Sequence, residues 1–550
     1  MITTDLQAML RSAIERAQAA GDLPSVPIPD IALQHPQNPA HGDFAANIAL
    51  RMARAAGMAP LAIAGAITRH VEMPGSVAAI EVAPPGFINV TLSNEWLRER
   101  VWEVLEAGDR YGSSDFGAGQ RVQIEFVSAN PTGPLHVGAG RNAALGDSLG
   151  NVLQAAGYEV EREYYLNDAG SQINALGASV FARYCQALSI GEPFPENGYQ
   201  GDYITELAQE LLDARGDYFT TLTRDQAISE MTELAVAQMQ RSIGADLERM
   251  YVRFDRWFSE RSLYEDGTYQ QTMNLLRQQG HVTERDGAVW FASSELGEDK
   301  DNVLVRSNGQ PTYFASDIAY HYDKFIRRNF DRVIDVWSAD HQGHVARMKA
   351  VVGALGIEPE RLTLMIYQLV NLVRDGKPVR MGKRSGEFVT LGEVLDDVGP
   401  DAVRFFLVAR SADAMMDFDL DLAKQQSNDN PVYYVQYAHA RVASILRGAE
   451  SIEPGQADLT LLQHESELAL LRKMSQLPEV IELAASTLAP HHLPYYAQEV
   501  ASAFHAFYRD CRVLSDDLPL THARLALVRA CQIVLANTLK LVGVSTPEKM

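Results

Sequence analysis

The first residues whose types and spacing could do chemistry surround His136, at the start of a helix predicted over about 138–156. Gly138 and Gly140 lie in its first turn, where a residue without a side chain lets the backbone approach a ligand closely. The first amide N–H groups of a helix have no partner within it, and the helix dipole is positive there, so the position favours phosphate. An imidazole at this point can donate to a phosphate oxygen. The segment predicts a phosphate site, with a capped helix packed through its glycines as the structural alternative.

The same segment also fits a second pattern, because Gly138 to Ala143 matches the dinucleotide-binding fingerprint G-x-G-x-x-A. Glu161 and Glu163 follow at the spacing expected of an acidic residue that binds a ribose. That fingerprint needs its first glycine at the end of a strand. Here about ten residues, two of them prolines, follow the predicted strand 122–127. We favour the phosphate site and keep a nicotinamide-dependent oxidoreductase as an alternative.

A second group is the basic segment 375–386, Asp375-Gly376-Lys377-Pro378-Val379-Arg380-Met381-Gly382-Lys383-Arg384-Ser385-Gly386. Its glycines permit changes of conformation, and its cations attract a polyanion such as a triphosphate. A solvated hairpin tip is the structural alternative. The presence of both groups in one acidic chain favours a joint role in binding one nucleotide.

Together the two groups suit the activation of a carboxylate by ATP. The carboxylate attacks the α-phosphate and pyrophosphate leaves, so the protein must hold the reactants in line and stabilise charge on the phosphates. A histidine at a helix start and a lysine on a glycine-rich segment do this without a protein nucleophile. We expect Mg²⁺ to arrive with ATP and predict no tightly bound protein metal.

The hydrophobic pattern around His136 predicts a β-α-β unit. Strands over 122–127 and 159–165 flank the helix, which indicates a parallel sheet. The other predicted elements are an α+β unit before about 110, a mostly helical stretch over about 166–250, strands at 302–306 and 332–337, a helix over 343–355, and helices from about 430 onward.

The composition indicates a large folded protein. A chain of 550 residues implies roughly three to five domains. The net charge of −23 excludes a globally basic nucleic-acid binder, so a nucleic acid would have to meet local basic patches. The three cysteines are far apart, which disfavours a disulfide framework or a zinc site. Without a signal peptide or an apolar run of roughly 18 residues, we expect a cytoplasmic protein with no membrane partner.

Both groups resemble signatures of the class I aminoacyl-tRNA synthetases. His136-Val137-Gly138-Ala139 resembles His-Ile-Gly-His, with Ala139 in place of the second histidine. The basic segment resembles Lys-Met-Ser-Lys-Ser, with Arg380 and Lys383 at the cationic positions and both serines replaced. These departures keep a degenerate, non-catalytic tRNA-binding relative as a second alternative.

Further segments narrow the resemblance to the arginyl-tRNA synthetase family, and it spans nearly the whole chain. They are 125–138, 162–170, 254–260, 312–320, 339–344 and 430–441. Each is weak alone, but their joint order is specific. The resemblance implies a multidomain α/β protein that has a class I Rossmann-like catalytic domain with a parallel sheet, an N-terminal α+β domain and a C-terminal all-α helical bundle.

The resemblance also implies domains and an activity. The implied domains are an additional tRNA-contacting α+β domain over 1–112, a catalytic domain over 113–390 with the helical insertion at about 166–250, a connecting or stem-contact segment over 391–430, and a helical anticodon-binding domain over 431–550. The implied enzyme is a ligase that activates L-arginine with ATP to arginyl-adenylate and transfers arginine to the 3′ end of tRNA(Arg). Activation is implied to require bound tRNA, and a monomer is expected.

An arginine site has definite chemical needs. A guanidinium is a planar fork of five donors that does not deprotonate, so it suits carboxylates with a phenol or carbonyl in the same plane. Tyr313 and Asp317 are spaced to share one face of a helix. The resemblance implies arginine binding by Glu125, Ser128, Asn130, Glu260, Tyr313, Asp317 and His341. It implies ATP binding by Pro134, His136, Gly138, Ala139, Gly140, Met381 and Lys383, with His136, Gly138, Lys383 and Arg380 as catalytic groups. The structural alternative is surface charge for the acids and packed core for the tyrosine.

Contacts with tRNA are expected from both ends of the chain. Aromatic residues and arginines are interleaved after about residue 430, a combination that reads unstacked bases, and Tyr437 and Arg441 are the candidates there. Phe44 and Asn47 are candidates in the N-terminal domain by resemblance. The alternative for the aromatic residues is the core of a helical bundle.

Overall fold

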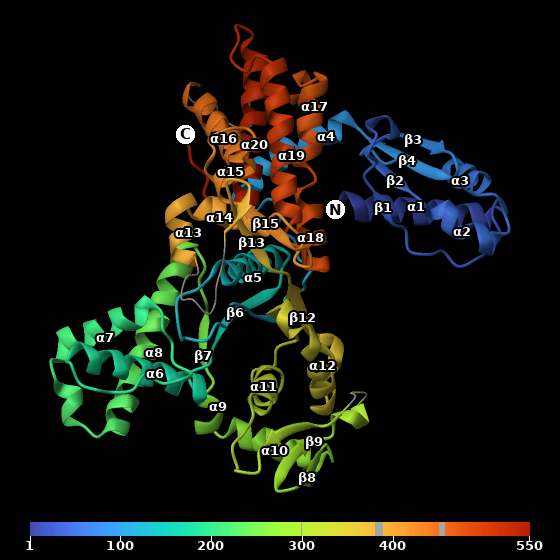
Figure 1. The fold of residues 1–550 in the computed structure, drawn as a ribbon. Coiled ribbons are helices and arrows are strands. Elements are labelled where there is room, and N and C mark those ends of the chain that lie inside the picture. Colours follow the sequence, from blue (N-terminus) through green and yellow to red (C-terminus); the bar gives the residue numbers. More distant parts are fainter. Residues whose placement is uncertain (297, 299, 380–388, 450–456) are drawn as a thin grey trace.

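A computed structural model describes residues 1–296, 298, 300–379, 389–449 and 457–550. Its N-terminal part is an α+β unit beside the C-terminal helices, drawn in blue in Figure 1. An antiparallel sheet of order β1-β2-β4-β3 packs with three helices. Its elements are α1 (Ile2–Ala19), β1 (Leu33–Gln34), β2 (Phe44–Ala46), α2 (Ile48–Ala56), α3 (Pro60–Arg69), β3 (Val77–Ala83) and β4 (Phe87–Leu92). The predicted α+β unit is confirmed.

A five-stranded parallel sheet forms the centre of the molecule. Its order is β12-β11-β5-β6-β7, and every neighbouring pair is parallel. The strands are β5 (Arg121–Glu125), β6 (Glu159–Leu166), β7 (Arg256–Ser259), β11 (Arg332–Ser338) and β12 (Leu362–Tyr367). Helix α5 (Val137–Ala155) joins β5 to β6 and is buried along most of its length. The predicted β-α-β unit is confirmed, and the carboxyl ends of all five strands meet at one edge.

Two insertions extend from this sheet. The first is helical, lies between β6 and β7, and contains α6 (Ser171–Ala187), α7 (Asp202–Arg215) and α8 (Arg224–Arg249). The second follows β7 with α9 (Ser262–Glu265), α10 (Thr268–Gln278), β8 (Val282–Arg285), β9 (Ala288–Phe291), β10 (Asn302–Val305) and α11 (Tyr313–Tyr322). The strand predicted at 302–306 is β10, which belongs to this separate antiparallel sheet. Helix α12 (Val345–Ala354) confirms the helix predicted over 343–355.

The chain then crosses to the C-terminal helices. The connecting elements are β13 (Val370–Arg374), β14 (Lys377–Pro378), α13 (Leu391–Val398), α14 (Pro400–Val408), β15 (Met416–Asp419) and α15 (Leu420–Lys424). The helices that follow are α16 (Pro431–Arg447), α17 (Glu465–Met474), α18 (Leu477–Thr487), α19 (His492–Asp510) and α20 (Leu518–Val542). Pro431 begins α16, where its missing N–H costs nothing, and the Asn430 side chain caps the helix by accepting from the Val432 amide.

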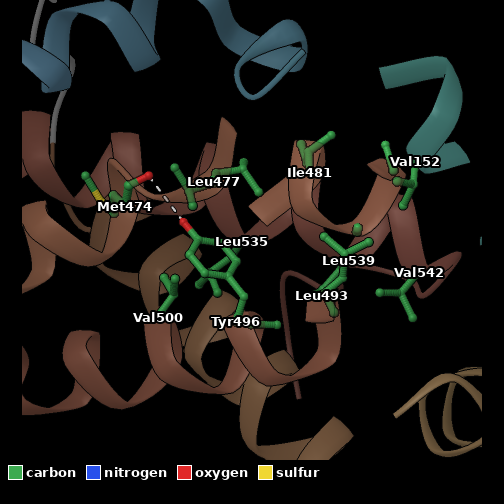
Figure 2. Close-up of a cluster of buried hydrophobic side chains, with 14 of the residues drawn as sticks. Val152, Met474, Leu477, Ile481, Leu493, Tyr496, Val500, Leu535, Leu539 and Val542 are labelled. Carbon is green, nitrogen blue, oxygen red and sulfur yellow. Dashed lines mark hydrogen bonds between the residues drawn. The ribbon is translucent and has the colours of Figure 1, made fainter. Parts of the chain in front are cut away.

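The helical bundle shares its core with the catalytic part. Figure 2 shows Val152 of α5 among the same side chains as Leu539 and Val542 of α20. The buried Tyr496 hydroxyl donates to the Met474 carbonyl at 3.2 Å, which satisfies its one polar atom. Within the described residues, α20 is the single unbroken helix that is long and apolar enough to cross a membrane, but 67% of its apolar window is buried inside the protein. It is therefore the core helix of the bundle.

One buried arginine joins these parts. The side chain of Arg404 on α14 is completely buried. Its guanidinium donates to the carbonyl of Val542 at 2.9 Å and to that of Met250 at 2.7 Å, and it pairs with Asp147 at 2.6 Å. A buried charge with these partners fixes the ends of α20 and α8 against α5.

Candidate active site

The start of α5 is shaped by the His136 side chain. His136 is the N-cap of the helix, and its Nδ1 accepts from the amides of Gly138 at 3.0 Å and Ala139 at 3.3 Å. Because Nδ1 is an acceptor, the proton of the neutral ring lies on Nε2. The expectation that these amides face an anion directly is corrected: they donate to the capping ring, so a phosphate reaches them only if the ring turns away. The ring itself lies on the exposed side.

The other residues of this turn have different surroundings. A Cβ on Gly140 would lie 2.7 Å from Leu391 Cδ1, so this glycine permits close packing of α5 on α13. Ala139 is buried, at 6% exposure, which leaves its methyl group inside the fold. Pro134 is half-buried in the preceding loop. The packing explains why small residues occupy two of these positions, and ATP contacts by the three residues remain predictions.

The first residues described after the basic segment lie beside His136. Thr390 pairs with His136 in an antiparallel bridge, and the amide of Leu391 donates to the carbonyl of Leu135 at 2.7 Å. Arg380, Met381 and Lys383 lie outside the described residues. Lys383 is seven residues from Thr390, and an extended chain of that length spans at most about 25 Å. The chain length alone therefore allows Lys383 to reach the start of α5, and its contact with ATP remains a prediction.

Three carboxylates gather at the carboxyl edge of the parallel sheet: Glu125 at the end of β5, Glu260 just after β7, and Asp317 on α11. We call them the carboxylate cluster. Burial raises the pKa of Asp317 to about 7. The interaction with His321 lowers this pKa, and the charges of Glu125 and Glu260 raise it further. Burial also raises the pKa of Glu260, which is 4% exposed, while hydrogen bonds from Ser316 and Tyr165 oppose the rise. A cationic ligand would relieve this crowding of acids.

A polar chain connects the cluster to the turn after β5. Ser128 Oγ donates to Glu125 Oε1 at 2.9 Å and accepts from the amide of Tyr165 at 3.1 Å. When the side-chain amide of Asn167 is flipped, its nitrogen donates to Glu260 Oε2 at 2.9 Å. In the same orientation its oxygen lies 3.2 Å from Asn130 Oδ1. Five predicted residues are thus brought together, namely Glu125, Ser128, Asn130, Glu260 and Asp317.

Two further predicted residues lie around this group. Tyr313 begins α11 and is 47% exposed, with its hydroxyl so near Gly170 that a Cβ there would approach it to 3.2 Å. It shares α11 with Asp317, as the spacing predicts. His341 follows β11 at the same sheet edge, and its ring lies 5.9 Å from that of Trp337 and 6.0 Å from that of His344. Its contact with arginine remains a prediction.

Sequence reasoning missed three residues of the site. Tyr165 is a neutral phenol beside the carboxylate cluster, because burial and the charges of Glu260, Asp317 and Glu125 raise its pKa well above the usual value. Asn167 bridges two predicted residues, and Lys324 pairs with Glu125. Tyr165 ends a predicted strand and Asn167 stands two residues after it, which was a usable signal. No sequence signal indicated Lys324, because a lysine side chain is normally exposed.

The predicted tRNA contacts have mixed surroundings. Phe44 is 2% exposed and faces the core of the N-terminal domain, so the expectation of a surface contact by its ring is corrected. Asn47, at the start of α2, is half-buried. The Arg441 guanidinium lies 5.2 Å from the ring centres of both Tyr437 and Tyr508, on a half-exposed face of the bundle. Such a stacked platform can receive a nucleic-acid base.

Metal ligands are a separate question. Across the described ranges, no group of three or more histidine, cysteine, aspartate or glutamate side chains is arranged to hold a metal ion. The carboxylate cluster itself contains a paired member, because Glu125 binds Lys324 at 2.7 Å. Its geometry suits an organic cation better than a metal.

Comparisons with known proteins cover nearly the whole chain. Three family models match: the arginyl tRNA synthetase N terminal domain over residues 4–92, the catalytic domain of tRNA synthetases class I (R) over 100–429, and the DALR anticodon binding domain over 435–550. The chain is 53% identical to an arginine–tRNA ligase of Dehalococcoides mccartyi, covering 98% of each chain. It is 49% identical to that of Carboxydothermus hydrogenoformans, covering 100% of this chain and 99% of the other. The arginyl-tRNA synthetase structure of Thermus thermophilus superposes with a TM-score of 0.78 at 25% identity, covering 99% of this chain and 100% of the other.

Proposed function

The chain belongs to the arginyl-tRNA synthetase family and is an arginine–tRNA ligase, and we propose that the carboxyl edge of its parallel sheet carries out both steps of the reaction. In the first step L-arginine is activated with ATP, and in the second it is transferred to tRNA(Arg). The observation that carries the proposal is the bridge between Thr390 and His136, which holds the chain that follows the basic segment against the start of α5. The match to the class I synthetase catalytic domain over residues 100–429 sets aside a nicotinamide-dependent oxidoreductase.

Activation makes one bond and breaks another. A carboxylate oxygen of arginine attacks the α-phosphorus of ATP, and the bond to the bridging oxygen of pyrophosphate breaks. His136 at the start of α5, with Lys383 and Arg380 from the basic segment, stabilises the negative charge that moves onto the phosphates. Mg²⁺ bound to ATP neutralises part of the same charge when present. In the second step a ribose hydroxyl at the 3′ end of tRNA attacks the arginyl carbonyl, and AMP leaves.

Arginine is held at both ends. Asp317 and Glu260 accept hydrogen bonds from the guanidinium, and Tyr313 closes that end from the start of α11. Ser128 and Asn130 receive the α-amino group. This assignment is supported by the hydrogen bond from Ser128 to Glu125 and by that from the flipped Asn167 amide to Glu260, which hold both ends of the site at the same sheet edge.

Binding of tRNA involves surfaces far from the cluster. We assign Arg441 and Tyr437 to a base of the anticodon region, because their stacked arrangement presents both a cation and a ring face. Asn47 is a candidate for the outer part of the tRNA. The protein works in the cytoplasm as a monomer, away from membranes, and activation waits for bound tRNA.

Exchange of pyrophosphate into ATP, driven by arginine, tests this function. We expect exchange with arginine in the presence of tRNA(Arg), and little without tRNA. Lysine as the amino acid is the matched control, because it is a cation without the planar fork and should not support exchange. A protein that binds tRNA but shows no exchange under either condition would contradict the proposal.

A further inference from the structure

Lys324 is a buried cation that the chemistry of the two steps does not use. It lies in a π-helical turn (Asp323–Arg327) directly after α11, and its side chain is 0% exposed. Its ammonium donates to Glu125 Oε2 at 2.7 Å and to Asp335 Oδ1 at 2.8 Å, and it lies 4.0 Å from the ring centre of Tyr320. A buried ammonium depends on such partners, because desolvation of an unpaired charge is costly.

One partner leads to the turn that carries Ser128. Glu125 holds Lys324 through one oxygen and the hydroxyl of Ser128 through the other. In this turn Val127 has φ of +66° and Ser128 has φ of +41°, a region that residues with side chains rarely adopt. The turn therefore needs outside support, and Asn142 supplies some by accepting from the Val127 amide at 2.9 Å. The Tyr165 amide, which donates to Ser128 Oγ at 3.1 Å, and the Lys324–Glu125–Ser128 chain add further support.

The other partner leads to α11. Asp335 Oδ2 lies 2.9 Å from His321 Nε2, and Nδ1 of the same ring lies 2.8 Å from the carbonyl oxygen of Asp317. The two ring nitrogens of His321 thus lie between a carboxylate oxygen of Asp335 and the backbone of α11. Through Asp335 and His321, the same ammonium is connected to the helix that carries Asp317.

Charge divides the acids into two sets. Glu125 and Asp335 are bound directly by Lys324. Asp317 and Glu260 are left for a ligand, because neither forms a salt bridge with a lysine or arginine among the described residues, and burial raises the pKa of both. Glu125 and Asp335 thus have a structural role through their salt bridges with Lys324, whereas Asp317 and Glu260 are available to bind the ligand.

We propose that Lys324 is a positioning residue for arginine, which fixes the Ser128 turn at a set distance from the carboxylates that receive the guanidinium. Lys324 acts through Glu125 and touches no reacting atom. The inference rests on the proposed function of this site. Its specific consequence is that loss of Lys324 weakens recognition of the α-amino group more than recognition of the guanidinium, because Glu125 holds the Ser128 hydroxyl directly, whereas the connection to Asp317 runs through Asp335 and His321.

The experiment compares two ligands on Lys324→Met, which keeps an unbranched side chain of similar volume and removes its charge. The ligands are arginine and guanidinovalerate, an arginine analogue without the α-amino group, each measured by its effect on ATP–pyrophosphate exchange with tRNA. We expect arginine affinity to fall at least about tenfold, while guanidinovalerate inhibition and the KM for ATP stay within about threefold. Equal weakening of both ligands, or unchanged arginine affinity, would overturn the inference.

Two further variants separate positioning from general damage. Ser128→Ala should cause the same selective loss, and the double variant Lys324→Met/Ser128→Ala should be no weaker than the worse single variant, because both act on one chain of contacts. A double variant whose loss of arginine affinity equals the product of the two single losses would contradict this expectation. Lys349→Met is the matched control, since that ammonium donates to the Pro359 and Leu362 carbonyls at the amino end of β12, and both ligands should bind normally.

The outcome also separates this inference from the proposed function. Wild-type exchange with arginine tests the function, and the ligand comparison tests only the role of Lys324. If Lys324→Met does not fold, Glu125→Gln serves in its place, because it breaks the same chain at the next residue. The same selective loss of arginine affinity is expected, and an equal loss for both ligands would overturn the inference.

Discussion

Replacement of Asp317 by asparagine is the sharpest test of the guanidinium site. The change keeps the shape of the side chain and removes its negative charge. Loss of one partner of a buried charge pair costs about 3–5 kcal/mol. Because Asp317 is only half-buried and Glu260 remains beside it, we expect a smaller loss of transition-state binding energy, about 2–4 kcal/mol. This loss corresponds to a decrease of about 30- to 1000-fold in kcat/KM for arginine.

The assay is arginine-dependent ATP–pyrophosphate exchange with saturating tRNA and ATP and with arginine varied. Asp225→Asn is the matched control, because Asp225 is exposed in the first turn of α8 and should leave kcat/KM unchanged. The KM for ATP should also be unchanged in Asp317→Asn. If kcat/KM for arginine stayed within about tenfold of wild type, a loss below about 1.4 kcal/mol, Asp317 would not hold the guanidinium.

Other consequences can be measured separately. Because the pKa of Asp317 is raised to about 7 and only its ionised form pairs with a guanidinium, KM for arginine should rise about tenfold as pH falls from about 8 to 6, and a flat profile in wild type would be contrary evidence. Arg404→Met should lower the free energy of unfolding by about 3–5 kcal/mol in urea, since it removes the nearest cation from the buried Asp147 and the donor to the Val542 and Met250 carbonyls; a change below about 1 kcal/mol would argue against that role. Gly146→Ala should destabilise by about 1–3 kcal/mol, because a Cβ would lie 2.3 Å from the Phe126 ring, and an unchanged Tm would show that the ring can move. Arg441→Ala should raise KM for tRNA and leave KM for arginine unchanged, whereas equal changes would place its effect elsewhere.

The local structure around α5 could be predicted from sequence. The predicted strand 122–127 is Arg121–Glu125, and the predicted helix 138–156 is Val137–Ala155. Both depend on short-range patterns of apolar residues and on Gly157 after the helix, which adopts a φ of +88°. Such signals are contained within the segment itself, so no knowledge of the rest of the chain was needed.

The contacts of the site could not be predicted in the same way. Glu125 and Lys324 are far apart in the chain, and only the order of the strands brings them together. Phe44 lies in a strand of three residues, too short for its alternation to show which side faces inward. The capping role of His136 depends on a side-chain rotamer that a motif does not specify. The family resemblance identified the candidate site residues, and the structure identified the groups with which they form hydrogen bonds and ion pairs.

The central claim is that the start of α5 and the basic segment hold one triphosphate. A structure of the protein with ATP and arginine bound tests it most directly, through the distances from His136 Nε2 and Lys383 Nζ to the phosphate oxygens. We predict that both atoms lie at about 3 Å from oxygens of the same triphosphate. A Lys383 ammonium more than about 10 Å from the nucleotide, with arginine in place, would contradict the account.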